Sequence, residues 1–333
     1  MELCREARPA VRKKILFFIL LGWVLLIVGD RVDELRVYQG AQIAMYTIAL
    51  ASIVLLTGYS GQVSLGNGAM MAVGGYAAAL TLTNLQTPIW FAFLMAIIAA
   101  SLFGALLGAA AARLSGPYLA GTTLALAVGL PAIANQFSFL GGEPGILFDV
   151  GFPPERLGEE FTQYKWFFWI ASSIALVALF ITSNILSSRF GRTWQAVRGN
   201  SLAAELAGVN SSRWKILAFT ISSALAGLAG AVFAMNISLV APGAYSLALS
   251  FALVTGAVLA GISSLPGVAF GALILVAIPE VADALAGRLG DADKLNNYLP
   301  GLIVSVLLIL SVIYTPNGPG ENLRKLRHKR KAH

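Results

Sequence analysis

The sequence predicts an all-α integral membrane protein with about ten transmembrane helices. Only 12% of the 333 residues are charged, about half of the share that is usual in soluble domains. Hydrophobic residues make up 57% of the chain and form runs that are long enough to cross a bilayer as helices. Helices are the expected form of these runs because backbone in lipid must satisfy its own hydrogen bonds.

The apolar runs are separated by turn residues and charges. Glycines separate the second run from the third, and Pro300 suits the first turn of the tenth. The first run follows five basic residues, as in a signal peptide. No small-residue cleavage site follows it, so we interpret it as a span. The ten expected spans are 15–29, 40–57, 64–83, 88–112, 117–139, 165–187, 216–238, 246–262, 266–284 and 299–314.

The Lys and Arg residues predict the orientation of the chain. With the N-terminus inside, the expected inner segments hold 17 of the 23 Lys and Arg residues and the outer segments hold six. This is the asymmetry that the positive-inside rule describes. An even number of spans then places both termini in the cytoplasm. We expect the basic tail after the last span to contact membrane lipid, and we expect no nucleic acid partner.

The order of the spans predicts a single transmembrane domain, 1–333, that contains two helical blocks. Spans two to five start outside and spans seven to ten start inside, so the blocks form inverted four-helix repeats if they share a fold. Such repeats place a solute path at their interface. The expected parts are an N-terminal tail and first span (1–39), a first helical block (40–139), a cytoplasmic loop (188–215), a second helical block (216–314) and a basic tail (315–333).

The expected spans lack the residues that catalysis would need. The single cysteine precedes the first span, both histidines lie in the basic tail, and the chain has no phosphate-binding Gly-x-x-x-x-Gly-Lys-Ser/Thr loop. We therefore expect a transport subunit that is not an enzyme and that holds neither a metal nor a cofactor of its own.

The cytoplasmic loop predicts a short helix with an exposed apolar edge. Ser201 can cap a six-residue helix that Gly208 ends. Leu202, Leu206 and Val209 repeat at helical spacing, so they share one face. Two interpretations stay open, because such an edge suits docking into a partner's groove and also suits a helix that lies on the membrane surface.

A glycine-rich segment, Gly58 to Gly68, lies between the second and third spans. Glycine at this density does not form a stable regular helix, and irregular backbone at membrane depth lines a cavity or packs on protein. A broken segment of this kind indicates a solute path. The alternative is a tight turn packed near the inner surface. The candidate path residues are Tyr59, Ser60, Gln62, Ser64 and Asn67.

One carboxylate, Glu280, lies within the ninth expected span. Its insertion costs about 2.5–3.5 kcal/mol, so it needs a partner or water, and Pro279 beside it is expected to kink the helix. Glu280 is therefore a further candidate for the solute path. The alternative, which we favour slightly, places it with Asp283 near the outer end of the span, where water reaches it.

Two motifs resemble the branched-chain amino acid permeases of bacterial ABC importers, of the LivM type. The stretch from Leu56 to Met70, followed by Gly74-Gly75-Tyr76, is similar to this family's signature after its second span. The cytoplasmic loop resembles the family's coupling loop, and the Pro279-Glu280 pair has a counterpart there. The resemblance runs from about residue 40 to about residue 315. It implies that the loop couples the chain to an ATPase through Gly191, Arg192, Arg198, Asn200, Leu202, Ala203, Ala204, Leu206, Gly208 and Val209.

The same resemblance implies a type II ABC importer permease in the bacterial cytoplasmic (inner) membrane, with branched-chain or related amino acids as its solutes. The implied partners are a second homologous permease subunit, two ABC ATPase subunits that bind ATP and Mg, and a solute-binding protein. The acidic outer segment 141–165 can dock that binding protein or be a solvated loop. Departures from the family pattern, such as Ser201 in place of an acidic residue, leave the solute open.

Two other functions remain open at this point. An ion-coupled secondary transporter would place ionisable residues on its path, and only Glu280 comes close. An ABC permease for urea, amides or another small carboxylic acid would share the features above, because a separate binding protein makes much of the choice of solute.

Overall fold

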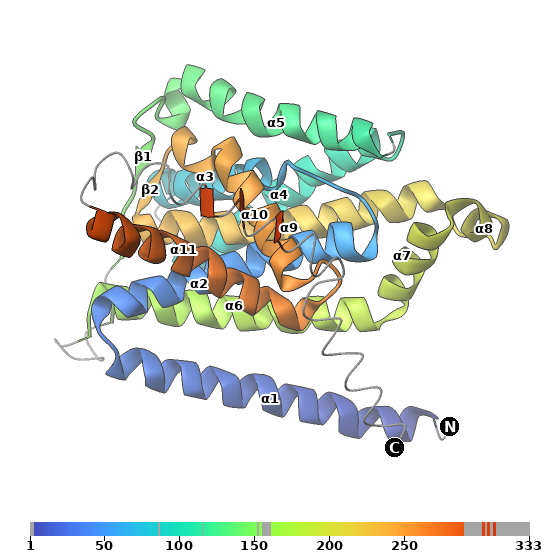
Figure 1. Ribbon diagram of the computed structural model, residues 1–333, viewed down its shortest axis with the longest axis horizontal. Helices are drawn as coiled ribbons and strands as arrows, with labels where there is room; N and C mark the ends of the chain where they lie inside the picture. Colours follow the sequence, from blue (N-terminus) through green and yellow to red (C-terminus); the bar gives the residue numbers. More distant parts are fainter. Residues whose placement is uncertain are drawn as a thin grey trace.

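The computed structural model describes residues 3–85, 87–114, 116–151, 153–154 and 161–289, and the residue pairs 302–303, 305–306 and 309–310. Nearly all of this part is helical (Figure 1). The helices are α1 (Leu3–Arg31), α2 (Glu34–Ile53), α3 (Asn67–Leu85), α4 (Ile89–Ala111), α5 (Pro117–Gln136), α6 (Gln163–Ser187), α7 (Arg189–Gly199), α8 (Ser201–Leu206), α9 (Ser211–Ile237), α10 (Leu247–Ala260) and α11 (Val268–Leu289). The short elements are the π-helical turn η1 (Val54–Tyr59), the 3-10 turns η2 (Ser138–Leu140), η4 (Pro242–Tyr245) and η5 (Leu265–Gly267), and the strands β1 (Ile146–Leu147) and β2 (Leu239–Val240).

The helices match the expected spans wherever the structure describes the chain. The helices α1 to α6, α9, α10 and α11 cover the first nine spans, and most of the tenth span lies outside the described residues. Seven segments of the described part are long and apolar enough to cross a membrane: Glu34–Tyr59, Ile89–Ala111, Tyr118–Gln136, Gln163–Ser187, Ser211–Ile237, Pro242–Ala260 and Leu265–Ala282. The chain is therefore a multi-pass, all-α membrane protein.

One small sheet departs from the all-helical expectation. The strand β1 pairs antiparallel with β2, so that Ile146 lies opposite Val240 and Leu147 lies opposite Leu239. A Cβ atom at Gly145 would lie 2.2 Å from the carbonyl oxygen of Val240, so only glycine allows this close approach. The sheet fastens the segment after α5 to the end of α9, far from α7 and α8 (Figure 1).

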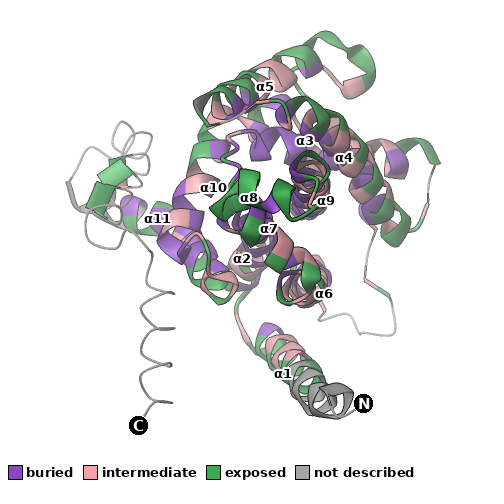
Figure 2. Cartoon of the chain, turned by 90° about the vertical axis from the view of Figure 1, so that its right-hand side faces the viewer, coloured by how far each residue is buried: buried purple, intermediate pink, exposed green. Residues whose placement is uncertain are grey.

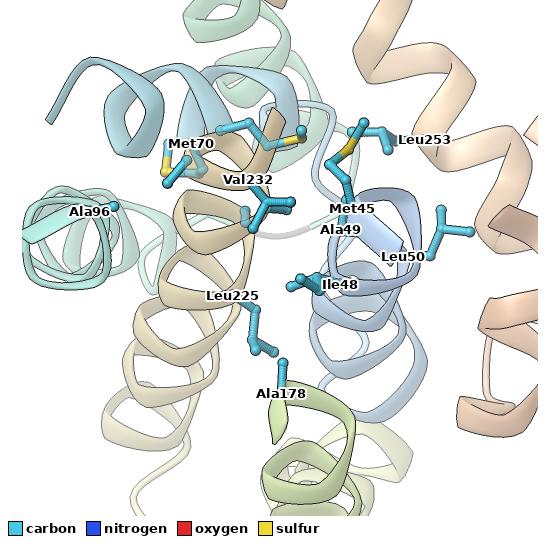
Figure 3. Close-up of a cluster of buried hydrophobic side chains, with 14 of the residues drawn as sticks. Met45, Ile48, Ala49, Leu50, Met70, Ala96, Ala178, Leu225, Val232 and Leu253 are labelled. Atoms are coloured by element: carbon cyan, nitrogen blue, oxygen red, sulfur yellow. The ribbon is translucent and has the colours of Figure 1, made fainter. Parts of the chain in front are cut away.

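The helices α2 and α9 form the centre of the bundle. Figure 3 shows the core between them, with Ile48 on α2 and Val232 on α9. Small residues let α3 and α4 pack closely on α9. A Cβ atom at Gly74 of α3 would lie 2.3 Å from the Cα atom of Gly227 on α9. These backbones therefore approach more closely than larger side chains would permit.

The packing partners of α2 and α9 are exchanged between the two expected helical blocks. The helices α3 and α4 of the first block pack on α9, and α10 and α11 of the second block pack on α2. The helices α2 and α9 run in opposite directions (Figure 1). Each is followed by an interruption before the next long helix, 60–66 in the first block and 238–246 in the second. The later helices of each block thus pack on the central helix of the other block, which is α9 for the first block and α2 for the second.

The two ends of the bundle differ. The start of α1, the helices α7 and α8, and the segment 60–66 lie at one end, which we call the inner end after the expected orientation (Figure 1). The strands β1 and β2 and the end of α11 lie at the other, outer end. The helix α1 packs mainly on α6 at one side of the bundle, and α5 lies at the opposite side (Figure 2).

Candidate coupling loop and inner broken segment

The loop that is expected in the cytoplasm folds as two helices, α7 and α8, that project from the inner end of the bundle (Figure 1). Asn200 caps α8, because its Oδ1 atom accepts a hydrogen bond from the N–H of Ala203 at 3.0 Å. The expected cap at Ser201 is wrong by one residue. Both residue types cap helices well, and the extended backbone of Asn200 (φ −158°, ψ 102°) decides between them. Gly208 follows the helix with a φ of +83°, as expected.

Two leucines form the exposed edge of α8. Leu206 is 84% exposed and Leu202 is 68% exposed, while Val209 is half-buried. Ala203 is exposed as well, and Ala204 is buried against the bundle. Figure 2 shows α8 mostly exposed on the face of the inner end. The apolar edge that the sequence predicts is therefore present and open to a partner or to the membrane surface.

Aromatic side chains anchor α7, a helix that sequence analysis missed. Trp194 is fully buried, and its Nε1 atom donates to the carbonyl oxygen of Trp214 on α9 at 2.9 Å. The ring centroids of Phe190 and Trp214 lie 5.5 Å apart. Gly191 lets α7 begin tightly against the end of α6, since a Cβ atom there would lie 2.0 Å from the carbonyl oxygen of Leu186. The helix α7 and the start of α9 therefore form one packed unit.

The two candidate arginines of α7 have different partners. Arg192 donates to the carbonyl oxygen of Ser187 at 3.4 Å, close to the start of its own helix. Arg198 reaches the bundle, where its guanidinium donates to the carbonyl oxygen of Gly58 and lies 3.5 Å from the Oγ atom of Ser263. Arg198 thus contacts the end of η1 and the connection between α10 and α11. Ser263 was not predicted as a site residue, because a contact between segments so distant in the chain leaves no local signal.

The segment 60–66 has no regular structure, as the glycine-rich sequence predicts, and its polar side chains are buried in the protein while Gly61 and Val63 are exposed. Ser60, Gln62, Ser64 and Asn67 are at most 5% exposed, and Tyr59 is half-buried. The π-helical turn η1 joins the segment to α2. The candidate path residues are therefore brought together at the inner end, with their side chains covered by protein in this conformation.

Side chains of the segment bind the central helices. The Nε2 atom of Gln62 donates to the carbonyl oxygen of Lys215 on α9 at 3.1 Å and to the Oγ atom of Ser60 at 2.8 Å. The Nδ2 atom of Asn67 donates to the Oγ atom of Ser52 on α2 at 3.1 Å. The Oε1 atom of Gln62 is buried and has no partner among the described residues. The segment is thus held to α9 by Gln62, and the first residue of α3 beside it is held to α2.

Two hydroxyl groups from other helices hold the backbone of this segment and of the first turn of α3. The N–H of Leu65 donates to the Oγ1 atom of Thr123 on α5 at 3.0 Å, and the N–H of Gly68 donates to the Oγ atom of Ser250 on α10 at 3.2 Å. Sequence analysis missed both hydroxyls, because isolated Thr and Ser residues in apolar helices carry no distinctive pattern. The packed turn that was left open as an alternative describes this arrangement, and contact with a solute stays a prediction.

Glu280 lies in the second half of α11, whose end is at the outer end of the bundle (Figure 1). Its side chain is exposed and accepts a hydrogen bond from the Nε2 atom of Gln39 near the start of α2. This position agrees with the interpretation that water reaches the carboxylate. The side chain of Asp283 lies outside the described residues, and the role of Glu280 in a solute path stays a prediction.

A small cavity of about 80 Å³ lies between α4, α5 and α9. It is lined by apolar side chains and two threonines, Thr122 and Thr123. None of the candidate residues named above lines it. The cavity adjoins the broken segment through Thr123 and Leu126, which both lie beside Gly66.

Comparison with known proteins identifies the family. The family model described as the permease component of the branched-chain amino acid transport system matches residues 38–312. The chain belongs to this family. The matched range contains the segment 60–66, the helices α7 and α8, and Glu280.

The permease resembles several characterised relatives. It is 28% identical over 296 residues to the high-affinity branched-chain amino acid transport system permease protein LivM of Salmonella typhimurium and to that of Escherichia coli. Each alignment covers 82% of this chain and 67% of the relative. It is 28% identical over 294 residues to LivH of Salmonella typhimurium, which covers 82% of this chain and 90% of that one. The family expected from the two motifs is confirmed.

One solved structure aligns with the permease over most of its length. PsaBC from Streptococcus pneumoniae in complex with Fab shares 16% identity with a TM-score of 0.45, over 91% of this chain and 98% of that chain. Within the described residues, no group of three or more His, Cys, Asp or Glu residues could hold a metal ion.

Proposed function

We propose that the permease is one subunit of an ABC importer that moves branched-chain or related amino acids across the bacterial cytoplasmic membrane. Membership of the permease family supports this proposal, and the relatives are named for the transport of those amino acids. The observation that carries it is the edge of α8, where Leu202 and Leu206 are exposed on a helix that projects from the bundle. An exposed apolar edge on a short helix fits the groove of a partner protein.

The proposed assembly contains a second homologous permease, two ATPase subunits and a solute-binding protein. The ATPase subunits bind ATP and Mg and contact α8 at the inner end. The binding protein delivers the solute at the outer end. ATP drives the cycle because it binds the ATPase subunits with different affinity in the two states of the complex, and this difference shifts the population of the permease states.

The candidate coupling residues divide into three proposed roles. Leu202, Ala203, Leu206 and Val209 form the surface that meets an ATPase, as the exposed part of the loop. Asn200 and Gly208 define the start and the end of α8, and Ala204 and Gly191 set its position against the bundle. Arg192 supports the first turn of α7 through Ser187, and Arg198 contacts the bundle itself.

We further propose that the segment 60–66 moves aside during transport and that the solute then passes its polar side chains. The candidate contacts are Tyr59, Ser60, Gln62, Ser64 and Asn67 at the inner end, with Glu280 at the outer end. Irregular backbone held by side-chain hydrogen bonds supports this proposal, because such a segment opens at a lower cost than a continuous helix.

Association with the ATPase subunits tests the proposed function. We expect Leu206→Glu to lower co-purification of the ATPase subunits at least about tenfold, because it places a charge in an apolar contact. The matched control is Glu205→Gln, which changes the neighbouring exposed residue and is expected to leave co-purification unchanged. Full association of the Leu206→Glu variant would contradict the proposal and would favour a membrane-surface role for α8.

The solute is tested separately. The binding protein that functions with the permease is purified and its ligands are screened by thermal shift with leucine, isoleucine, valine, urea, amides and small carboxylic acids. Stabilisation by branched-chain amino acids is the expected result. If urea or an amide alone stabilises the binding protein, the proposal of an ABC importer stands and the proposed solute changes.

A further inference from the structure

We propose that Arg198 is a positioning residue that ties the coupling loop to the inner ends of both helical blocks and keeps the segment 60–66 covered. This proposal rests on the proposed function for its role in transport. The structural part of the proposal, that Arg198 holds the inner end closed, is argued only from contacts within this chain.

Arg198 contacts three separate segments. Its guanidinium donates to the carbonyl oxygen of Gly58, at the end of η1 in the first block, and lies 3.5 Å from the Oγ atom of Ser263, between α10 and α11 in the second block. Its aliphatic part lies beside Gly61, where a Cβ atom would lie 2.7 Å from the Cγ atom of Arg198. One side chain of the cytoplasmic loop therefore holds an inner segment of each block.

The two inner segments also contact each other directly. A Cβ atom at Gly58 would lie 1.9 Å from the carbonyl oxygen of Ile262 and 3.3 Å from the Cα atom of Ser263. The contact is between backbones, so no side chain lies between the blocks here. Arg198 spans this junction from the cytoplasmic side, and separation of the two blocks at this place would break at least one of its contacts.

The bonding of Arg198 suits a contact that forms and breaks. Its partners are a backbone carbonyl and a hydroxyl group, whereas the one ion pair among the described residues joins Lys165 and Asp30 at the outer end. A cationic donor makes a stronger hydrogen bond to a carbonyl than a neutral donor does. A carbonyl and a hydroxyl can each be solvated by water when the contact opens, so no buried carboxylate is left unpaired.

The helix that carries Arg198 moves with α9. Trp194 joins α7 to α9 by a hydrogen bond to Trp214 and by packing, whereas Gly58 and Ser263 belong to other elements. A pull on α8 displaces the unit of α7 and the start of α9, and Arg198 then moves relative to both of its partners. Arg198 is thereby the point where the displacement reaches the inner ends of the two blocks.

The test measures how accessible the segment 60–66 is to water. Ser64 is 4% exposed, and Ser64→Cys is nearly isosteric, so a cysteine there reports on opening. The natural Cys4 is replaced by Ser, and the full chain is placed in liposomes with its partner subunits and without ATP. We expect Arg198→Met, which keeps the aliphatic contact with Gly61, to raise the rate of labelling by a water-soluble maleimide at least about tenfold.

Arg192→Met is the matched control, because Arg192 lies on the same helix and bonds only locally to Ser187. Its labelling rate is expected to stay within about twofold of the parent. Arg198→Lys keeps the charge and one donor, so it is expected to give an intermediate rate, and it carries the test if Arg198→Met accumulates poorly. The proposal would be overturned if the labelling rate is unchanged in whichever Arg198 variant is produced in sufficient amount. It would also be overturned if Arg192→Met raises the labelling rate as much as the Arg198 variant does.

A second readout separates this proposal from the proposed function. We expect Arg198→Met to retain the ATPase subunits and ATP hydrolysis while solute uptake falls at least about tenfold, whereas Leu206→Glu loses the subunits themselves. Loss of the ATPase subunits from Arg198→Met would place Arg198 in the docking surface and overturn its internal role. If the parent chain binds no ATPase, the proposed function fails, and the labelling result still decides whether Arg198 closes the inner end.

Discussion

At the scale of single residues, the structure of the inner end of the permease depends on a few residues that cannot be replaced without loss of a contact. Gly58 contacts the backbone of Ile262, and Asn200 supplies the cap of α8. Gly58 acts through the close approach of two backbones and Asn200 through a side-chain hydrogen bond to the backbone, which explains why the sequence indicated the region but not each partner.

Gly58→Ala is expected to destabilise the permease. The added methyl group would lie 1.9 Å from the carbonyl oxygen of Ile262, so the two inner segments must separate, at a cost of about 1–3 kcal/mol. A lower melting temperature in detergent is the measurement. Gly121→Ala is the control, since a Cβ atom there meets nothing within 4 Å, and it is expected to leave the melting temperature unchanged or slightly higher. Equal stability of the Gly58 and Gly121 variants would contradict the close approach.

Asn200→Ala is expected to fray α8. Loss of the cap costs a helix about 1 kcal/mol, which is large for a helix of six residues. Faster amide exchange at Ala203 and lower affinity for the ATPase subunits are the measurements. Ser201→Ala serves as the comparison and is expected to have a smaller effect, because Asn200 is the residue whose side chain accepts from Ala203. A larger effect at Ser201 would restore the cap that the sequence alone suggested.

At the scale of elements, α7 joins the exposed helix α8 to the central helix α9. Trp194→Phe keeps much of the buried ring and removes the donor to Trp214, so we expect a loss of about 1–2 kcal/mol in stability. Trp194→Ala is expected to cost about 3–5 kcal/mol. Melting temperatures check both, and Trp90→Phe on the exposed side of α4 is the control, with little expected change. An unchanged melting temperature of Trp194→Ala would show that Trp194 does not stabilise the packing of α7 on α9.

Sequence analysis located the helices well because long apolar runs have few other forms in a membrane. It missed α7, although Phe190, Trp194 and Val197 repeat at helical spacing, because the three charged or polar residues between them resemble a plain loop. The partners of the segment 60–66 were beyond its reach. Thr123, Lys215 and Ser250 come from three other helices, and only the folded chain shows which isolated hydroxyl or carbonyl group meets that segment.

At the scale of the whole molecule, two helical blocks complete each other around α2 and α9, and the expected orientation places α8 in the cytoplasm. Single cysteines at Leu206 and Glu143, two exposed positions at opposite ends, test this orientation. The cysteine at Leu206 is expected to react only from the cytoplasmic side and the cysteine at Glu143 only from the other side. The reverse pattern would move the coupling loop away from any cytoplasmic ATPase.

The central claim is that the permease receives its driving force from separate ATPase subunits through α8. Uptake of radiolabelled leucine into liposomes tests it most directly, with the permease reconstituted together with its partner subunits and with ATP supplied on the side of α8. We expect accumulation that requires ATP, is lost in Leu206→Glu and persists after ion gradients are collapsed. Accumulation by the permease alone, driven by an ion gradient without ATP, would contradict the account.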